Sequence, residues 1–131
     1  MSGDRYLLDT NAVVSLLRGG GALQKRLQSA QWVGISILSY IEFLAFPTLS
    51  ENDRRIFQTF SEAIDVVSLD RTERALIDTV IRLRSQHRLK LPDAIIAATA
   101  IERGATLITD DQQLRRLSAV KSSGTDSGEL V

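Results

Sequence analysis

Cysteine is absent from this chain of 131 residues, and His87 is its single histidine. The lack of cysteine excludes disulfides, thiolate nucleophiles, iron–sulfur clusters and zinc sites with sulfur ligands. A serine–histidine–aspartate triad would have to use His87, which lies in a basic, polar stretch at residues 84–88. The side chains left for catalysis are mainly carboxylates, hydroxyls and cations. An enzyme of this composition would therefore depend first on Asp and Glu.

Long apolar runs and an excess of one charge are also missing. No run approaches the roughly 20 apolar residues of a membrane helix, and no signal-peptide pattern opens the chain. We therefore expect a soluble, cytoplasmic protein with no membrane partner. The formal net charge is zero, which argues against nucleic-acid binding by bulk positive charge alone. The charge is uneven, however, because residues 71–121 contain ten basic and six acidic residues.

The length corresponds to one globular domain. We expect that domain over residues 1–121, followed by a disordered, polar tail at residues 122–131. Short apolar runs predict strands at residues 6–8, 32–35, 64–67 and 105–108, and a faint fifth strand at 119–120. Helical spacing and cap residues predict helices at residues 12–18, 22–29, 39–46, from 50 onward, 71–88, 93–103 and 112–117. In this interpretation Ser39 opens the third helix and Asp70 caps the long one.

The alternation of short strands with helices predicts an α/β fold in three layers. A central parallel sheet of four to five strands would carry helices on both faces. We expect the strand order 3-2-1-4-5, which makes strands one and four neighbours. Ligands of such sheets bind outside the carboxyl ends of the strands, where the strand order reverses.

Acidic residues gather at the places that this rule selects. Asp9 follows the first strand, and Asp110 and Asp111 follow the fourth. Glu42 lies in an apolar stretch, and Asp93 begins the most apolar helix of the chain. Each position also has a purely structural interpretation. Asp9 can cap a helix, and Glu42 can form a capping box with Ser39.

The remaining acids have structural interpretations too. Asp93 can be a first-turn acid favoured by the helix dipole, and Asp110 and Asp111 can be turn and cap residues. The functional interpretation depends on several acids meeting at one edge of one sheet. Clustered carboxylates repel one another unless a cation lies among them. Oxygen ligands without sulfur or imidazole favour Mg²⁺ or Mn²⁺, and the chemistry indicated is metal-assisted attack of water on a phosphate ester.

Four segments of the chain carry a family resemblance, in order and over residues 5–117. They are Leu7-Leu8-Asp9-Thr10-Asn11, Ser39-x-x-Glu42, Leu91-Pro92-Asp93-Ala94-x-Ile96-Ala97-Ala98 and Leu107-Ile108-Thr109-Asp110-Asp111. With these segments the chain resembles PIN-domain ribonucleases, and among them the VapC-type toxins of toxin–antitoxin pairs. The resemblance implies the PIN-like version of the fold described above. Two departures are Leu114, where the family often has an aromatic residue, and the polar C-terminal end.

The resemblance assigns roles to individual residues. Asp9, Glu42 and Asp93 match the first three catalytic acids of the family. The fourth is Asp111 by the family's spacing, with Asp110 as a possible substitute. Asp9, Asp93 and Asp111 would hold one or two Mg²⁺ or Mn²⁺ ions. Thr10 and Asn11 would orient Asp9, and Thr109 would bond a metal-bound water.

The same resemblance implies an activity and partners. The activity would be metal-dependent RNA cleavage by a homodimeric toxin that a small antitoxin protein inhibits. The alternative within the family is an RNA-processing nuclease or an inactive RNA-binding module without a toxin role. Basic side chains in the second half could contact RNA phosphates locally, or simply form a solvated surface. They are Arg82, Arg84, Arg88 and Lys90.

Two other α/β families place acids after the first strand. Haloacid-dehalogenase-like phosphatases need Asp-x-Asp, and Asn11 takes the place of the second Asp. Phospho-acceptor receiver domains could use Asp70 as acceptor and Lys121 after the fifth strand, but they also need paired acids after the first strand. The sequence lacks that pair, so both alternatives fit less well than the PIN-domain family.

Overall fold

Strands and helices alternate along the chain in the computed structural model, which describes residues 3–125. The strands are β1 (Arg5–Leu8), β2 (Trp32–Ser36), β3 (Asp65–Val67), β4 (Thr106–Ile108) and β5 (Ser122–Ser123). The helices are α1 (Thr10–Leu17), α2 (Gly21–Gln28), α3 (Ile37–Leu44), α4 (Glu51–Glu62), α5 (Arg74–His87), α6 (Leu91–Glu102) and α7 (Gln112–Arg115). The α/β class predicted from the sequence is confirmed.

The five strands form one sheet in the order β3-β2-β1-β4-β5, and every pair in it is parallel. At its carboxyl end β1 pairs Leu8 with Ile35 of β2 and with Ile108 of β4. The predicted order 3-2-1-4-5 is therefore confirmed, and β1 and β4 are neighbours where the order reverses. A receiver-like sheet would have the order 2-1-3-4-5, so the strand order excludes that alternative.

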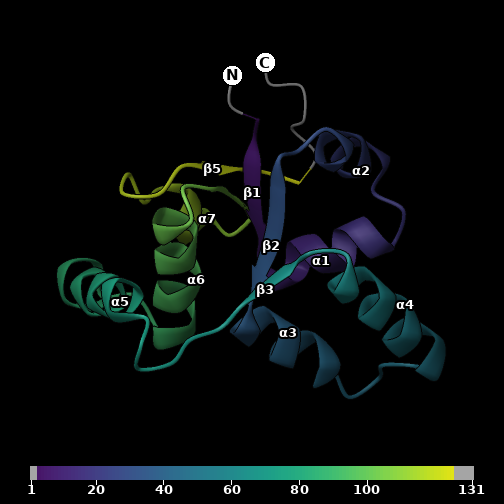
Figure 1. Ribbon diagram of the computed structural model, residues 1–131, viewed down its shortest axis with the longest axis horizontal. Helices are drawn as coiled ribbons and strands as arrows, with labels where there is room; N and C mark the ends of the chain where they lie inside the picture. Colours follow the sequence, from purple (N-terminus) through teal and green to yellow (C-terminus); the bar gives the residue numbers. More distant parts are fainter. Residues whose placement is uncertain (1–2, 126–131) are drawn as a thin grey trace.

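Helices cover both faces of the sheet, with α5 and α6 on one side and α1 to α4 on the other (Figure 1). The alternation of side chains along β1 divides the core accordingly. Leu7 packs in the cluster with α5 and α6, whereas Leu8 packs in the cluster with α1, α3 and α4. Seven consecutive residues of α6, Ala94 to Ala100, are buried, which confirms the burial predicted for this apolar helix.

Several helices begin at residues other than those predicted; α1, for example, starts two residues earlier, at Thr10. Ser36 caps α3 by accepting a hydrogen bond from the backbone N–H of Leu38 at 3.0 Å, so the prediction that Ser39 opens this helix is wrong. Asp70 does not cap α5; it closes a turn by accepting from the N–H of Thr72 at 2.8 Å. The α6 helix starts two residues earlier than predicted, at Leu91. Proline is compatible with a helix only in the first turn, and Pro92 still satisfies that condition.

The fifth strand differs in position from the one predicted at residues 119–120. It is Ser122–Ser123, where the N–H of Thr109 donates to the carbonyl of Ser123 at 2.9 Å. The start of the expected polar tail thus forms the edge of the sheet next to β4. The expectation of disorder for residues 126–131 lies outside the described residues. Within residues 3–125, no helix has the length and apolar character needed to cross a membrane.

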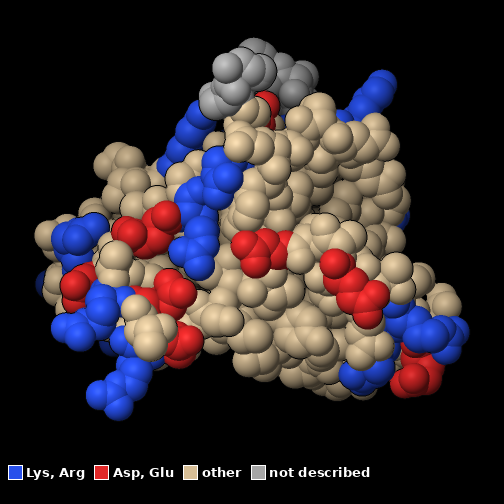
Figure 2. Space-filling view, in the orientation of Figure 1, with Lys and Arg blue, Asp and Glu red and all other residues tan. Residues whose placement is uncertain are grey.

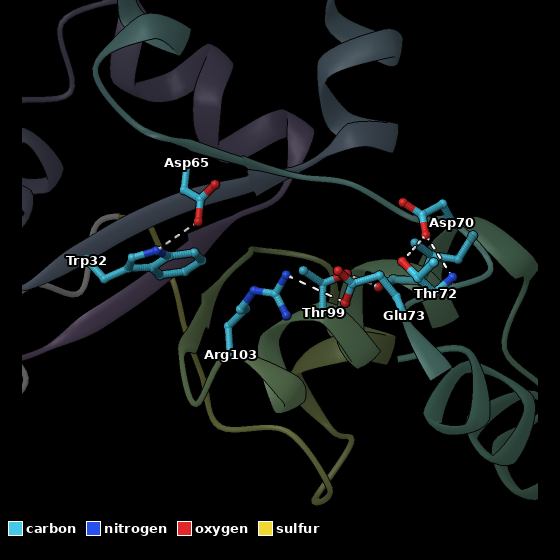
Figure 3. A network of polar contacts seen from close by, with 8 residues as sticks. Trp32, Asp65, Asp70, Thr72, Glu73, Thr99 and Arg103 are labelled. Atoms are coloured by element: carbon cyan, nitrogen blue, oxygen red, sulfur yellow. Dashed lines mark hydrogen bonds and ion pairs between the residues drawn. The ribbon is translucent and has the colours of Figure 1, made fainter. Parts of the chain in front are cut away.

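A tryptophan covers the sheet face at β2 and β3. Figure 3 shows the Trp32 indole beside Asp65, to whose carboxylate its Nε1 donates at 3.2 Å. The guanidinium of Arg5 lies 4.9 Å from the centre of the same ring. The ring fits because Gly34 has no side chain: a Cβ there would lie 2.6 Å from Trp32 Cζ2 and 3.0 Å from the Asp65 carbonyl oxygen. The glycine therefore makes room for the indole.

Replacing that glycine tests the packing. We expect Gly34→Ala to lower the free energy of unfolding by about 1–3 kcal/mol, because the added methyl must displace the indole or bend the strand. Urea unfolding followed by Trp32 fluorescence measures the change. Gly21→Ala is the matched control, since a Cβ at Gly21 has no neighbour within 4 Å, and it should leave stability equal or slightly higher. Equal loss of stability in both variants would contradict this account.

Candidate active site

The carboxylate of Asp9 lies at the carboxyl end of β1, at the centre of the sheet's edge. Asp9 as a whole is only 7% exposed. One oxygen, Oδ1, accepts a hydrogen bond from the backbone N–H of Ala12 at 2.7 Å, so Asp9 is the N-cap of α1. The other, Oδ2, accepts from the hydroxyl of Thr109. A single side chain thus joins the end of β1, the start of α1 and the end of β4.

Thr109 is the second half of this junction. It is fully buried, and its hydroxyl donates to Asp9 while it accepts from the backbone N–H of Asp111 at 3.0 Å. The backbone N–H of Asp9 also donates to the carbonyl of Ile108 at 3.2 Å. The family resemblance implied that Thr109 hydrogen-bonds to a metal-bound water. In the structure, the Thr109 hydroxyl donates a hydrogen bond directly to Asp9.

Burial raises the pKa of Asp9 above its ordinary value of 3.8, because removing the charged form from water is unfavourable. The hydrogen bonds from Thr109 and Ala12 oppose this rise, and the charges of Asp110 and Asp111 add to it. Asp9 is therefore a carboxylate whose ionised form is incompletely compensated by its protein surroundings.

Glu42 reaches the same edge from α3. Its Oε1 accepts a hydrogen bond from the hydroxyl of Thr10, the first residue of α1, at 2.6 Å. The structural alternative for Glu42, a capping box with Ser39, is excluded, since Ser36 is the cap and Ser39 lies inside the helix. Thr10 was expected to orient Asp9, and the structure places it against Glu42 instead. Asn11 is exposed on α1, and the hydrogen-bond partners of the Asp9 carboxylate within residues 3–125 are Ala12 and Thr109.

Asp93 enters from the first turn of α6 and is partly buried. Burial raises its pKa, the negative charge of Asp111 raises it further, and the charge of Glu42 adds a smaller amount. The cation of Lys90 opposes these effects. The charges of Asp111, Lys90 and Glu42, from three different segments of the chain, therefore all act on Asp93.

The two neighbouring acids after β4 have different surroundings. Asp111 caps α7, with its Oδ1 accepting from the N–H of Leu114 at 3.1 Å, and its charge acts on both Asp9 and Asp93. Asp110 accepts from the backbone N–H of Thr125 at 3.0 Å and from the Thr125 hydroxyl at 2.7 Å. Its carboxylate therefore fastens the segment after β5. The charge of Asp110 also acts on Asp9, but that of Asp111 alone of the two acts on Asp93 as well, which favours Asp111 as the fourth acid of the site.

The predicted RNA-contacting cations are exposed, but only some lie near the acids. Lys90 precedes α6 and acts on Asp93, whereas Arg82 on α5 donates to Thr79 at 3.4 Å. Arg84 lies in the last turn of α5, and Arg88 ends it with a left-handed backbone, φ 55°. Figure 2 shows basic and acidic side chains interleaved over the α5 side of the molecule. On the face shown, the basic residues are separated by acidic ones and do not form one continuous positive surface.

The donor set agrees with a hard divalent cation, although a closed cage is not formed. Within residues 3–125, no group of three His, Asp or Glu side chains is close enough together to hold a metal ion. The ion pairs of this part of the chain, Arg54–Glu51 and Arg103–Glu73, involve none of the site acids. Mg²⁺ needs only one or two carboxylates, because it keeps several waters. The pKa values of Asp9 and Asp93 are raised, chiefly by burial, so their ionised forms are unfavourable in the metal-free site.

Some contacts of the site were not anticipated from the sequence. The partnership of Asp110 with Thr125 joins positions 15 residues apart through a polar segment that carries no strand-like pattern. The bond between Thr10 and Glu42 spans 32 residues. Ser36 could have been recognised as a cap, because a serine directly after an apolar strand often starts a helix.

Comparison with the sequence models of known families gives a clear match. The sequence model of the PIN domain matches residues 6–120 of this chain. No curated protein matches it.

Solved structures share the fold at low identity. A toxin–antitoxin complex from Klebsiella pneumoniae is 23% identical with a TM-score of 0.72, covering 88% of this chain and 94% of that one. VapBC2 from Rickettsia felis, bound to a DNA fragment from its promoter, is 17% identical with a TM-score of 0.77, covering 92% and 98%. VapBC-1 from Haemophilus influenzae is 20% identical with a TM-score of 0.72, covering 92% and 98%.

The raised pKa of Asp9 leads to a pH prediction for the metal-free protein. Its folded pKa exceeds the unfolded 3.8, so its stabilising contribution is complete below pH 3.8 and is lost as the pH rises through the folded pKa. In the presence of chelator at pH 7, the free energy of unfolding of Asp9→Asn should therefore exceed that of wild type by on the order of 1 kcal/mol. Its urea midpoint should be higher accordingly. The difference should shrink as the pH falls toward 3.8.

Asp70→Asn is the matched control with the opposite sign. Hydrogen bonds from Thr72 lower the pKa of Asp70, so its contribution is present at neutral pH and disappears as the pH falls through that lowered pKa. Asp70→Asn should be less stable than wild type at pH 7. Loss of stability at pH 7 in the Asp9 variant would contradict the burial argument.

Proposed function

This chain belongs to the PIN domain family, and we propose that it is a metal-dependent endoribonuclease that acts as the toxin of a toxin–antitoxin pair. The observation that supports the proposal is the placement of Asp9 and Asp111 after the neighbouring strands β1 and β4, with Asp93 in the first turn of α6 where the charge of Asp111 acts on it. Burial raises the pKa values of Asp9 and Asp93, and the negative charge of Asp111 adds to both rises. A site of this kind is suited to binding a cation and a phosphodiester.

In this proposal Asp9, Asp93 and Asp111 hold one or two Mg²⁺ or Mn²⁺ ions. A bound divalent cation would supply neutralisation of charge on the phosphodiester and acidification of the attacking water. Thr109 and the Ala12 N–H keep the Asp9 carboxylate in a fixed orientation. A ligand fixed in this way loses little conformational entropy when the ion binds.

The residues around the acids take supporting roles. Glu42 lies at the exposed side of the site, where it accepts a hydrogen bond from Thr10. It faces the substrate, and it either accepts a proton from the attacking water or orients that water toward the phosphate. Lys90 lies beside Asp93 and contacts a phosphate of the RNA. Arg84 and Arg88 extend that contact along the backbone, while Arg82 is occupied by Thr79 and contributes less. Because these contacts are few, RNA affinity should be modest and salt-sensitive.

The partners proposed are an RNA substrate, a small antitoxin protein and a second copy of the chain in a homodimer. The support for the antitoxin is that similar folds were solved as toxin–antitoxin complexes, over more than nine-tenths of those chains. A cytoplasmic location follows from an RNA substrate of this kind.

Cleavage of a structured RNA in the presence of Mn²⁺ tests the nuclease proposal. We expect activity in wild type, its loss in chelator, and a fall of more than about 100-fold in Asp9→Asn, since even substitutions that act behind a ligand cost 10–100-fold. Asp93→Asn and Asp111→Asn should behave alike. Activity that survives both chelator and Asp9→Asn would refute a metal-dependent site.

Asp110→Asn is the matched control within this series. It removes a carboxylate adjacent in sequence to Asp111, but one that is bonded to Thr125. We expect it to keep activity within a few-fold of wild type while lowering thermal stability slightly. If Asp110→Asn abolishes cleavage and Asp111→Asn does not, Asp110 and not Asp111 is the fourth acid of the site.

Expression in a bacterial host tests the toxin role separately. We expect growth arrest with wild type, none with Asp9→Asn, and relief when a small protein encoded by the neighbouring reading frame is co-expressed. Colony counts after induction measure the effect. Normal growth together with RNA cleavage in vitro would favour an RNA-processing nuclease, and absence of both would favour an inactive RNA-binding module.

A further inference from the structure

The hydroxyl of Ser39 is a buried polar group without a partner. Ser39 is 1% exposed, and within residues 3–125 its Oγ is the single buried side-chain nitrogen or oxygen that lacks a hydrogen bond. Buried hydroxyls almost always find a partner, because burial without one is unfavourable by about 1–3 kcal/mol. An exception of this kind requires a specific explanation.

The position of Ser39 explains why the helix does not satisfy it. A buried hydroxyl in a helix usually donates to the carbonyl four residues earlier, and Thr99 in α6 does so, donating to Ile95 at 2.7 Å. Four residues before Ser39 is Ile35, which belongs to β2 and precedes the helix cap. Ser39 lies in the first turn of α3, so no helical carbonyl is in place to accept from it.

Ser39 follows the end of β2 by three residues, and that end lies beside the carboxyl end of β1, because Ile35 pairs with Leu8, the residue before Asp9. Ser39 precedes Glu42 by three residues, and residues at this spacing share a helix face. Its neighbour Leu38 packs with the α5–α6 core, whereas Phe43 belongs to the core of α1 and α4. Ser39 therefore lies in a helix that contacts both α1 and α6. Asp9 is the N-cap of α1, and Asp93 lies in the first turn of α6.

We propose that Ser39 is a positioning residue of the acidic site, whose hydroxyl hydrogen-bonds to an oxygen ligand of the divalent cation. That ligand is a water in the absence of RNA. The inference rests on the proposed function and extends it to a residue that carries no charge. In the metal-free chain the hydroxyl has no protein acceptor, so its partner arrives with the ion and its shell of waters.

Calorimetric titration with Mn²⁺, together with urea unfolding in chelator, tests the proposal on the full chain. Ser39→Ala should weaken Mn²⁺ binding about tenfold, as substitutions behind a metal ligand do. It should leave metal-free stability equal or higher, because it removes an unsatisfied group. Ser39→Thr keeps the hydroxyl and should recover most of the affinity.

Thr99→Val is the matched control and should show the opposite pattern. It removes a buried hydroxyl that has a partner, so it should lower metal-free stability and leave Mn²⁺ affinity unchanged. Wild-type affinity in Ser39→Ala would overturn the proposal, and so would lower metal-free stability in that variant, because the hydroxyl would then have a structural partner. If wild type and Asp9→Asn both fail to bind Mn²⁺, the proposed function itself fails, and this inference fails with it.

Discussion

The burial of one carboxylate is the constraint on which the site depends. Asp9 lies where the strand order reverses, and its two oxygens are bonded to the start of α1 and to Thr109 after β4. These bonds connect three elements that the sheet alone would leave free to shift. They do not fully compensate the charge, as the raised pKa shows. The same residue therefore organises the edge of the sheet and leaves it in need of a cation.

The structural and the functional interpretations of these acids do not exclude one another. Asp9 and Asp111 are both helix caps, and each cap uses one carboxylate oxygen. A carboxylate has about four acceptor sites on its two oxygens, so a cap fixes the group without exhausting it. Capping is thus a means of orienting a ligand on a short loop. Asp110 differs because both of its oxygens accept from Thr125.

The sequence was sufficient to predict the class, the strand order and the placement of Asp9 and Asp111 after neighbouring strands. Alternating short strands and helices allow few parallel arrangements, and the carboxyl ends of neighbouring strands necessarily meet. The errors concern contacts between residues far apart in sequence. Local spacing favoured Ser39 and Glu42 as a capping box, whereas Thr10, 32 residues away, holds Glu42. The fifth strand has two serines and no apolar pattern, since only pairing with β4 defines it.

Exposure increases outward across the site. Asp9 is buried, Asp93 is partly buried, and Glu42 and Asp111 are exposed. A cation beside Asp9 would therefore be drawn to the least hydrated carboxylate, where charge neutralisation gains most. The substrate would approach from the exposed side, which carries Glu42 and Lys90. Because ion binding requires ionised carboxylates, the rise in pKa that destabilises the metal-free fold also makes cation binding pH-dependent. Stability and cation affinity are then two consequences of the same buried charge.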